Sequence, residues 1–335
     1  MLTRRTFKGP WAGLPIAWNA HDEFDEATYR ADITRCCDAE VPGIYTGGTT
    51  GEFYALEIDE FETITRVTVE ACHEHRTPVM IGCTATSTRG AARRAAIAAK
   101  AGADAIQVAL PFWLPLQDAE VLPFFREVSR ASGGLPLSVY ETTRAKKCLT
   151  VDQHRRIHEA ISQYLMVKAN AGTVAATPEG CQALSSFVNV FVGESLWAEL
   201  GQHGVTGSCS AMVYWNPWVV LAAWQSLSRQ DWPALNVAGK KIVMLHDFLM
   251  EAFGDRNFSD SADDRNAARA TGFLRTSLHT RGPYASPTEE DVIVLRRWLE
   301  QHYPEMLDLR PTPQRHKLQP HLHDLAKRDS AIPQK

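Results

Sequence analysis

Short apolar runs alternate with amphipathic segments along the first ~215 residues of the chain. The runs occupy residues 43–50, 78–85, 105–112, 135–142, 164–171, 188–195 and 206–213, with a weaker earlier run at 14–19 that Pro15 interrupts. From 43 to 206, consecutive runs begin 35, 27, 30, 29, 24 and 18 residues apart. This spacing leaves room for a helix after most runs, which is the βα unit of a parallel sheet.

The segments between the runs carry helix signals. Residues 90–101 are rich in alanine, and Thr150-Val151-Asp152-Gln153 matches a capping box. An i, i+3 apolar ladder is formed by Ile58, Phe61, Ile64 and Val67. Repeated βα units of this kind predict an α/β fold, the (β/α)8 TIM barrel. A doubly wound sheet is the alternative, but no G-x-G-x-x-G motif follows the first strands.

The pattern divides the chain into three parts. Residues 1–215 are expected to form the barrel core, and residues 216–303 the barrel-closing and C-terminal helices. Within this helical extension, 232–253 and 265–278 are helix-like, and Ser286-Pro287-Thr288-Glu289 predicts an N-cap at Ser286. Residues 304–335 contain several prolines among basic and polar residues, so an extended or disordered tail is expected there.

The composition is that of a globular protein with a large core. Of the 335 residues, 44% are hydrophobic and 22% are charged. The net charge of -4 and the pI near 6.3 argue against a nucleic-acid-binding surface. No apolar run reaches the ~18–20 residues of a membrane span. Residues 1–11 lack the apolar stretch of a signal peptide.

The seven cysteines show neither the spacing of a disulfide framework nor a C-x-x-C pair. Reduced thiols are typical of the cytoplasm, which is therefore the expected location. His and Cys residues gather at 72–75 and at 321–323, but neither group completes a zinc ligand set. The sequence predicts no metal site and no cofactor.

Lys168 stands near the end of the run 164–171, after mostly apolar residues. A strand of this kind is buried on both faces, and burial lowers the pKa of a lysine. A neutral amine can attack a carbonyl group and form a Schiff base. From this run alone, the alternative is a lysine whose stem follows the strand while its amine reaches solvent.

Two other strand ends carry groups that could act with such an amine, because active sites of this fold lie at the C-terminal ends of the strands. The run 43–50 leads into Gly47-Gly48-Thr49-Thr50-Gly51-Glu52, whose glycines permit tight turns and leave N–H groups free for an anion. The run 135–142 brings Tyr140 near its end. An anion cradle, a phenol and an amine on one rim suit a Schiff-base lyase. The alternative for the threonines is ordinary capping of a βα turn.

These residues give the sequence a resemblance to the dihydrodipicolinate synthase / N-acetylneuraminate lyase family of class I aldolases. The resemblance extends from about residue 13 to about residue 304. Tyr140 and Lys168 are 168 − 140 = 28 residues apart. The matching elements are Gly48-Thr49-Thr50-Gly51-Glu52, Tyr140, Val167-Lys168 and Gly204-x-x-Gly207-x-x-Ser210.

The resemblance implies roles for the matching residues. Lys168 would form the Schiff base, and Tyr140 would exchange protons with the substrate hydroxyl. Thr49 would couple to Tyr140 and, with Thr50, bind the carboxylate of a 2-oxo acid. The remaining substrate-binding residues of the matching motifs would be Gly48, Gly51 and Ser210.

Variable positions on the same rim are expected to set the specificity: Trp113, Glu141, Arg144, Glu194, Ser195 and Ser208. Glu194 and Ser195 come directly after Gly193 at the end of the run 188–195, where the sialic-acid lyases of the family bind substrate hydroxyls. A hydroxylated substrate is therefore expected, and a solvated loop is the alternative.

Three departures from the synthase pattern limit the resemblance. The usual Lys-x-x-x-Gly is kept as Lys168 and Gly172, but Asn170 and Ala171 between them are individual to this chain. The synthases carry Asn-x-Pro-x-Arg after the catalytic tyrosine, whereas this chain has Glu141-Thr142-Thr143-Arg144-Ala145. Arg144 falls one residue early, which on an extended segment turns it to the opposite face. Phe112-Trp113 replaces two tyrosines, of which the second relays protons in a neighbouring subunit. We therefore expect a poor dihydrodipicolinate synthase, especially if Glu141 faces the pocket and repels a second carboxylate.

The resemblance and the residues together predict a lyase that forms an imine between Lys168 and a 2-oxo acid. The expected reaction is aldol cleavage or condensation with pyruvate as one component. The alternatives are a Schiff-base dehydratase or deaminase of a 2-keto-3-deoxy-type acid and a barrel that binds a 2-oxo acid without turnover. The expected partner is a small-molecule 2-oxo acid, and the expected assembly is a homodimer or homotetramer, since the family usually forms homo-oligomers.

Overall fold

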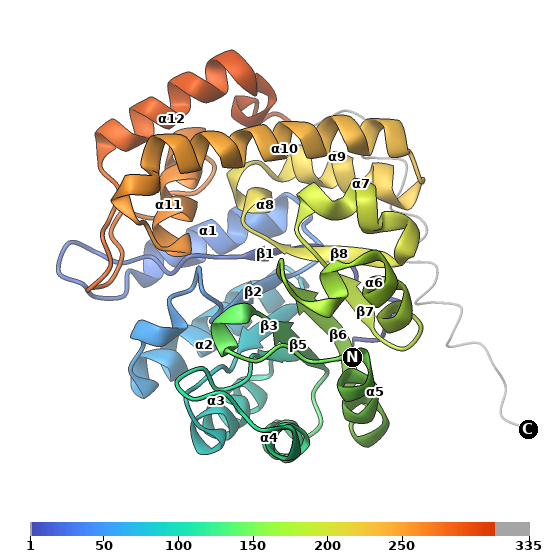
Figure 1. The fold of residues 1–335 in the computed structure, drawn as a ribbon. Helices are drawn as coiled ribbons and strands as arrows, with labels where there is room; N and C mark the ends of the chain where they lie inside the picture. Colours follow the sequence, from blue (N-terminus) through green and yellow to red (C-terminus); the bar gives the residue numbers. More distant parts are fainter. Residues whose placement is uncertain (1, 312–335) are drawn as a thin grey trace, which may run out of the picture.

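The predicted (β/α)8 barrel is confirmed: parallel strands close into a barrel in sequence order (Figure 1). The computed structural model describes residues 2–311. The eight strands are β1 Gly9–Gly13, β2 Ile44–Thr46, β3 Val79–Gly82, β4 Ala105–Val108, β5 Leu137–Glu141, β6 Tyr164–Ala169, β7 Asn189–Phe191 and β8 Val205–Ser210.

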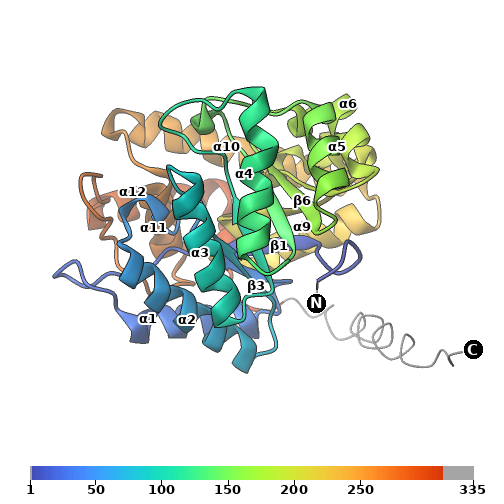
Figure 2. The same cartoon turned by 90° about the horizontal axis from the view of Figure 1, so that it is seen from below.

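Helices follow the strands and cover the outside of the barrel (Figure 2). Those of the βα units are α1 Glu26–Asp38, α2 Ile58–Glu74, α3 Thr88–Ala101, α4 Asp118–Ala131, α5 Val151–Ala160, α6 Pro178–Ser185 and α7 Trp197–Leu200. The capping box predicted at Thr150 is present, with its hydroxyl accepting from the backbone N–H of Gln153. This hydrogen bond explains why α5 begins directly after Thr150.

The first strand lies earlier in the chain than the sequence pattern indicated. The weak apolar run at 14–19 was the expected strand, but β1 ends at Gly13. Residues 9–12 pair with 207–210 of β8, and this pairing closes the barrel. Pro15 cannot donate a ladder hydrogen bond, so the following apolar residues, such as Ile16 and Trp18, are buried without joining the sheet.

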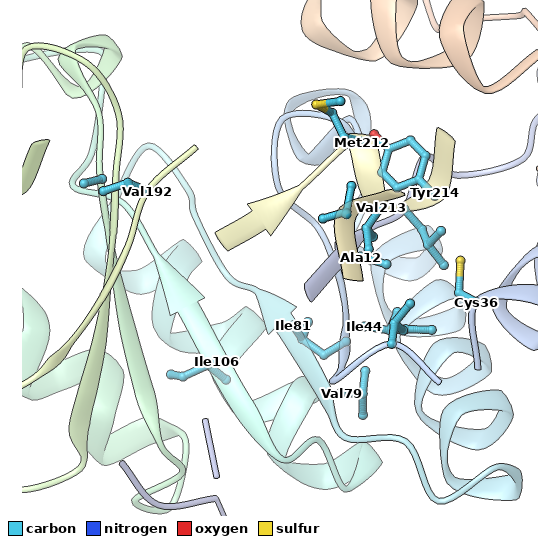
Figure 3. Packing of buried hydrophobic residues seen from close by; sticks show 14 of the residues in the cluster. Ala12, Cys36, Ile44, Val79, Ile81, Ile106, Val192, Met212, Val213 and Tyr214 are labelled. Atoms are coloured by element: carbon cyan, nitrogen blue, oxygen red, sulfur yellow. The ribbon is translucent and has the colours of Figure 1, made fainter. Parts of the chain in front are cut away.

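Alternation along the strands separates two apolar clusters. Inside the barrel, Met166 packs with residues such as Tyr45 and Phe191. Between the strands and the helices lies the larger cluster, which includes Ile44, Val79, Ile81 and Ile106 (Figure 3). Lys168 is two residues after Met166 on β6, so it shares the inward face and lies at the C-terminal end of the strand.

The C-terminal part of the described chain is the predicted helical extension, which lies along one side of the barrel (Figure 1). It contains α8 Met212–Trp215, α9 Pro217–Ser228, α10 Trp232–Phe253, α11 Asp260–Thr271 and α12 Glu289–His302. The bounds of α10 are those expected from the sequence. α11 starts before the expected residue 265 and ends at Thr271, where Gly272 adopts a positive φ of 79°. Thr288, and not Ser286, is the N-cap of α12, because its hydroxyl accepts from Asp291 N.

The tail expected to be extended from residue 304 begins differently. Pro304–Leu307 forms a 3-10 helix in which Met306 is fully buried. Asn216 holds this turn by donating from its side-chain amide to the carbonyl oxygens of Glu305, Met306 and Asp308. The rest of the predicted tail, from residue 312, lies outside the described residues.

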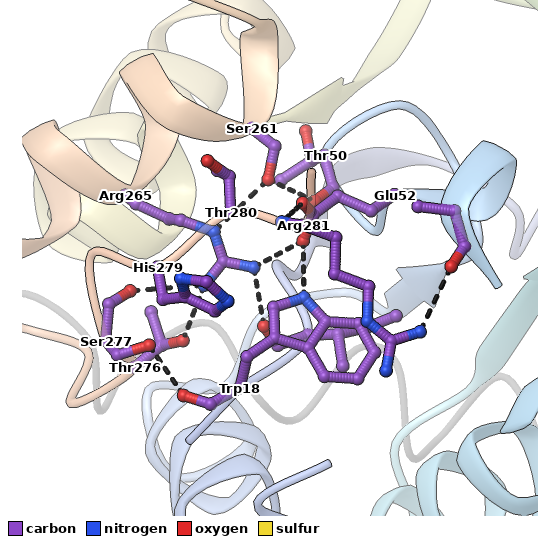
Figure 4. Close-up of polar contacts among 12 residues, drawn as sticks. Trp18, Thr50, Glu52, Ser261, Arg265, Thr276, Ser277, His279, Thr280 and Arg281 are labelled. Carbon is purple, nitrogen blue, oxygen red and sulfur yellow. Dashed lines mark hydrogen bonds and ion pairs between the residues drawn. The ribbon is translucent and has the colours of Figure 1, made fainter. Parts of the chain in front are cut away.

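A buried ion pair joins the loop after β2 to α11 (Figure 4). Glu52 and Arg265 are both fully buried, with 2.6 Å between Oε2 and Nη2. The same carboxylate accepts from Trp18 Nε1 at 2.7 Å and from the backbone N–H of Arg281 at 2.9 Å. Arg265 also donates to the carbonyl oxygen of Ile16 at 2.7 Å. Both buried charges are therefore hydrogen-bonded on several sides, as their burial requires.

We expect Glu52→Gln to destabilise the protein strongly. The substitution leaves the Arg265 guanidinium buried without its counter-charge, which typically costs about 3–5 kcal/mol. The midpoint of urea unfolding measures the loss. Glu127→Gln is the matched control, because the Glu127–Arg130 pair is exposed to solvent and should contribute only about 0–1 kcal/mol. Equal effects of the two substitutions would contradict the anchoring role of Glu52.

Candidate active site

Lys168 projects into the mouth of the barrel between two tyrosines. Its Nζ donates to the hydroxyl of Tyr45 at 3.3 Å and lies 4.1 Å from the centroid of the Tyr140 ring. Tyr140 and Lys168 are register partners on the adjacent strands β5 and β6, so the barrel itself sets their separation. Lys168 is half-buried, and the amine lines a cavity of about 420 Å³.

The surroundings of Lys168 act on its pKa in opposite directions. Burial is the strongest influence and favours the neutral amine. Interactions with Tyr140, Tyr45 and Cys209 favour the ammonium, and together they raise the pKa of Lys168 above its ordinary value. Burial therefore acts in the expected direction, but the net shift of the Lys168 pKa is upward. A proton must leave Lys168 before it can attack a carbonyl.

The phenol of Tyr140 is held by Asn170. Asn170 Nδ2 donates to Tyr140 Oη at 3.1 Å, which leaves the phenolic O–H free to donate into the pocket. The same hydrogen bond would stabilise the oxyanion that remains after Tyr140 gives up its proton. Tyr140 thus lies beside the amine with one proton available for transfer.

The glycine-rich turn after β2 lies beside these groups. The cavity that contains Lys168 is lined by Thr50, and an adjacent cavity by Gly48 and Thr49. Among the described residues, the backbone N–H groups of Thr49 and Thr50 have no protein acceptor, which suits the binding of an anion. A side chain at Gly48 would overlap the ring of Tyr45, and one at Gly51 would approach Gly47 N to 2.8 Å.

The coupling of Thr49 to Tyr140 that the family resemblance implies is not made directly. No hydrogen bond between Thr49 and Tyr140 is present in the described chain, where Tyr140 is bound by Asn170. The neighbouring hydroxyl of Thr50 donates instead to Asp264 Oδ2 at 2.6 Å. Thr50 is therefore fixed by α11, and its backbone N–H, more than its hydroxyl, is available to a carboxylate.

Two carboxyl groups of α11 border the cavity with shifted pKa values. Burial raises the pKa of Asp264 to about 7, although its hydrogen bond from Thr50 acts against the shift. Burial likewise raises the pKa of Asp263 to about 6, and the nearby Asp260 adds to the effect. Near neutral pH, Asp264 is therefore divided between its protonated and ionised forms.

Arg144 lines the adjacent cavity that Gly48 and Thr49 also line, contrary to the expectation that its early position would turn it away. Thr143–Ala145 is a 3-10 helix, so the two-residue alternation of a strand does not apply. The guanidinium forms a bidentate ion pair with Asp260, with distances of 2.8 and 2.7 Å. This contact raises the pKa of Arg144 further above its usual range, so the guanidinium stays charged and Asp260 is its counter-charge.

Glu141 does not face the pocket. It follows Tyr140 on β5 and therefore points away from the barrel interior. Its buried carboxylate accepts from the backbone N–H of Leu149 at 3.0 Å. The predicted repulsion of a second carboxylate by Glu141 is therefore excluded by the alternation of the strand.

The remaining predicted rim residues are only partly brought together. Glu194 and Ser210 line the Lys168 cavity, whereas Ser208 is buried and donates to Glu194 Oε1 at 2.7 Å. Ser195 lies in a separate depression of about 640 Å³ against α10. Trp113 is 73% exposed and lines neither of the two cavities at the barrel mouth.

The second cavity, of about 370 Å³, adjoins the first at Tyr140 and Asp260. Its wall contains few charges and many rings. The aromatic residues that line it are Phe53, Tyr54, Phe112, Tyr140, Phe258 and Tyr284. We call it the aromatic cavity, and the one containing Lys168 the lysine cavity.

Sequence reasoning missed several residues of this site. Tyr45 lies within the second apolar run, and strand alternation toward Thr46 and the turn could have placed it on the inner face. Asn170 was seen as a departure from the family but received no role. No sequence pattern marked Asp264 as a site residue, because its position depends on how α11 packs over the barrel mouth.

No group of three or more His, Cys, Asp or Glu side chains in residues 2–311 is arranged to hold a metal ion. Within the same residues, no helix is both long and apolar enough to cross a bilayer.

Curated relatives differ in their activities and in the length of the match. A probable 5-dehydro-4-deoxyglucarate dehydratase of Methylobacterium radiotolerans is 27% identical over 79% of this chain and 82% of its own. An N-acetylneuraminate lyase of Enterobacter sp. is 27% identical over 44% of this chain and 50% of its own. A 4-hydroxy-tetrahydrodipicolinate synthase of Nitrobacter hamburgensis is 31% identical over 48% of this chain and 53% of its own.

Solved structures share the fold. YagE of E. coli K12, determined in complex with pyruvate, superposes with a TM-score of 0.80 at 21% identity, covering 91% of this chain and 99% of its own. PhdJ bound to a substrate intermediate gives a TM-score of 0.79 at 22% identity, covering 92% of this chain and 99% of its own. The profile of the dihydrodipicolinate synthetase family matches residues 6–292. The chain therefore belongs to the dihydrodipicolinate synthetase family.

Proposed function

We propose that the protein is a class I aldolase-type lyase that forms an imine between Lys168 and a 2-oxo acid. The observation that carries the proposal is the placement of the Lys168 amine 4.1 Å from the centroid of the Tyr140 ring. The adjacent turn offers free N–H groups at Thr49 and Thr50 for the carboxylate of the 2-oxo acid. The family to which the chain belongs supports this class of reaction.

In the proposed reaction, the Lys168 amine adds to the C2 carbonyl of the substrate, and loss of water leaves a protonated imine. Tyr140 gives its proton to the hydroxyl that leaves as this water and becomes a phenolate. The phenolate then accepts the proton of the C4 hydroxyl, directly or through a water molecule, as the C3–C4 bond breaks. The electron pair of that bond forms an enamine with the imine nitrogen, and an aldehyde leaves. Protonation at C3 and hydrolysis then release pyruvate and restore the amine. Condensation follows the same steps in reverse.

A second candidate reaction is dehydration of a 2-keto-3-deoxy-type acid. The observation that favours it is the alignment with a probable dehydratase, which covers most of both chains. The same imine would then assist removal of a C3 proton, and the C4 hydroxyl would leave as water. Product analysis separates the two reactions, because only the cleavage releases pyruvate and an aldehyde. A cytoplasmic location and a homodimer or homotetramer remain predictions.

We expect pyruvate and borohydride to modify Lys168 covalently, because reduction converts the imine to a stable secondary amine. Peptide mass mapping should find pyruvate, less water and plus two hydrogens, on Lys168. Lys168→Arg should abolish the modification, whereas Lys147→Arg should not, since Lys147 pairs with Asp118 away from the site. Modification at another lysine of the active protein would refute the proposed imine.

Tyr140→Phe is expected to permit the imine but to slow turnover by about 10²–10⁴-fold, because it removes a general acid–base. Asn170→Ala should reduce kcat less, since it removes only the hydrogen bond to the phenol. Steady-state kinetics and borohydride trapping, measured on the same preparations, separate the two steps. Full kcat in Tyr140→Phe would mean that another group moves the proton.

Asp264 is expected to make the folded protein less stable as the pH rises from about 4 to about 7. Its raised folded-state pKa of about 7 exceeds the ~3.9 of an unfolded aspartate. Between these values the folded state binds more protons, so the free energy of unfolding falls with rising pH.

The substitution Asp264→Asn should flatten this fall by up to about 1.4 kcal/mol per pH unit. Urea unfolding at several pH values measures this slope. Asp118→Asn is the control, because Asp118 is exposed. An unchanged slope in Asp264→Asn would show that the burial of Asp264 does not control this pH dependence.

A further inference from the structure

We propose that the substrate carries an uncharged aromatic group beyond its 2-oxo acid end, and that the aromatic cavity binds this group. The inference rests on the proposed imine at Lys168 and extends it to the class of substrate. It adds an aromatic group to the hydroxylated 2-oxo acid that the sequence predicts.

The aromatic cavity has walls suited to a flat apolar group. Phe53 and Phe112 meet edge to face, with ring centroids 5.9 Å apart and planes at 83°. Tyr54 and Tyr284 form a second such pair at 5.0 Å, and Leu110 adds an aliphatic surface. Aromatic groups favour edge-to-face and offset contacts at these distances, so a further ring has favourable partners on more than one side.

The charges of the cavity are already paired. Among the described residues that line it, Arg144 and Asp260 are the charged ones, and they form the bidentate ion pair described above. A second carboxylate on the substrate would have to displace Asp260 from Arg144, or remain without a counter-charge in a partly apolar cavity. Both outcomes are unfavourable.

The lysine cavity argues against a second carboxylate as well. Its lining includes Glu194, Asp260, Asp263 and Asp264 beside the single lysine, Lys168. Once Lys168 has formed the imine, this wall offers one carboxylate binding place, at the free N–H groups after β2. A monocarboxylate therefore fits the charge distribution better than a dicarboxylate.

The geometry allows one molecule to occupy both cavities. They share Tyr140 and Asp260, so a chain that leaves the imine passes Tyr140 to enter the aromatic cavity. The C4 hydroxyl of an aldol would thus lie next to Tyr140, with its substituent directed toward Phe53 and Phe112. The volume of about 370 Å³ is ample for an aryl group, since apolar cavities of about 150 Å³ already bind benzene.

Competitive imine trapping tests this inference without depending on which bond the enzyme breaks. Pyruvate, 2-oxo-4-phenylbutanoate and 2-oxoglutarate are offered separately with borohydride, and the concentration dependence of Lys168 labelling is compared. The phenyl compound should label Lys168 at least about 10-fold more efficiently than 2-oxoglutarate, and more efficiently than pyruvate. Equal labelling, or preference for 2-oxoglutarate, would overturn the inference and leave the imine intact. Absence of labelling by all three would overturn the proposed function as well.

Two substitutions identify the cavity responsible. Phe112→Ser should reduce labelling by the phenyl compound about 10-fold relative to pyruvate, which reports whether the imine site is still formed. Trp113→Ser is the matched control, because Trp113 is adjacent in sequence but its ring is 73% exposed. If the two variants behave alike, the phenyl group does not bind in the aromatic cavity.

Asp260→Asn provides a test by gain of binding. The substitution removes the counter-charge of Arg144, so 2-oxoglutarate should gain roughly 10-fold in labelling relative to the phenyl compound. Asp263→Asn is the control, since Asp263 borders the lysine cavity without contacting Arg144. A gain in Asp263→Asn equal to that in Asp260→Asn would show that general loss of negative charge, and not the freed Arg144, is responsible.

Discussion

The buried contact between Glu52 and Arg265 joins the two parts of the molecule on which the site depends. Glu52 ends the glycine-rich turn after β2, and Arg265 lies on α11, more than two hundred residues later in the chain. With this contact in place, the hydroxyl of Thr50 reaches Asp264 and Asp260 reaches Arg144. The helical extension is therefore part of the barrel mouth, because α11 supplies three carboxyl groups to the lysine cavity and one of them, Asp260, also lines the aromatic cavity.

The amine of Lys168 depends on a balance that the barrel geometry creates. Parallel pairing of β5 and β6 places Tyr140 beside it, and Tyr45 reaches it from β2. Burial would favour a neutral amine, but the two phenols reverse this effect. These phenols therefore influence the protonation of the amine before a substrate arrives, and Tyr140 lies close enough to supply a proton once the amine has added to a carbonyl.

The sequence predicted those features that depend on local pattern. The spacing of the apolar runs predicted the barrel. The strand ends predicted two site residues, Tyr140 and Lys168, which the structure places side by side. Prediction failed where tertiary packing decides. Arg144 faces the cavity because its segment is a 3-10 helix, Glu141 faces away because strand alternation continues through it, and Asp264 enters the site from α11. The placements of Arg144 and Asp264 leave no periodic signal in the sequence, whereas that of Glu141 follows from its alternation with Tyr140 and was open to prediction.

The two cavities also show why membership of a family does not define a substrate. Imine chemistry requires the groups of the lysine cavity, and those groups come from strands whose register the barrel fixes. The aromatic cavity is built from Phe53, Phe112, Phe258 and Tyr284, which lie outside the strands of the barrel. Loops can exchange their side chains without disturbing strand register. Substrate preference can therefore change along these loops while the lysine and its phenols remain. Among the described residues that line the aromatic cavity, the pairing of Arg144 with Asp260 leaves no free cation for a second carboxylate.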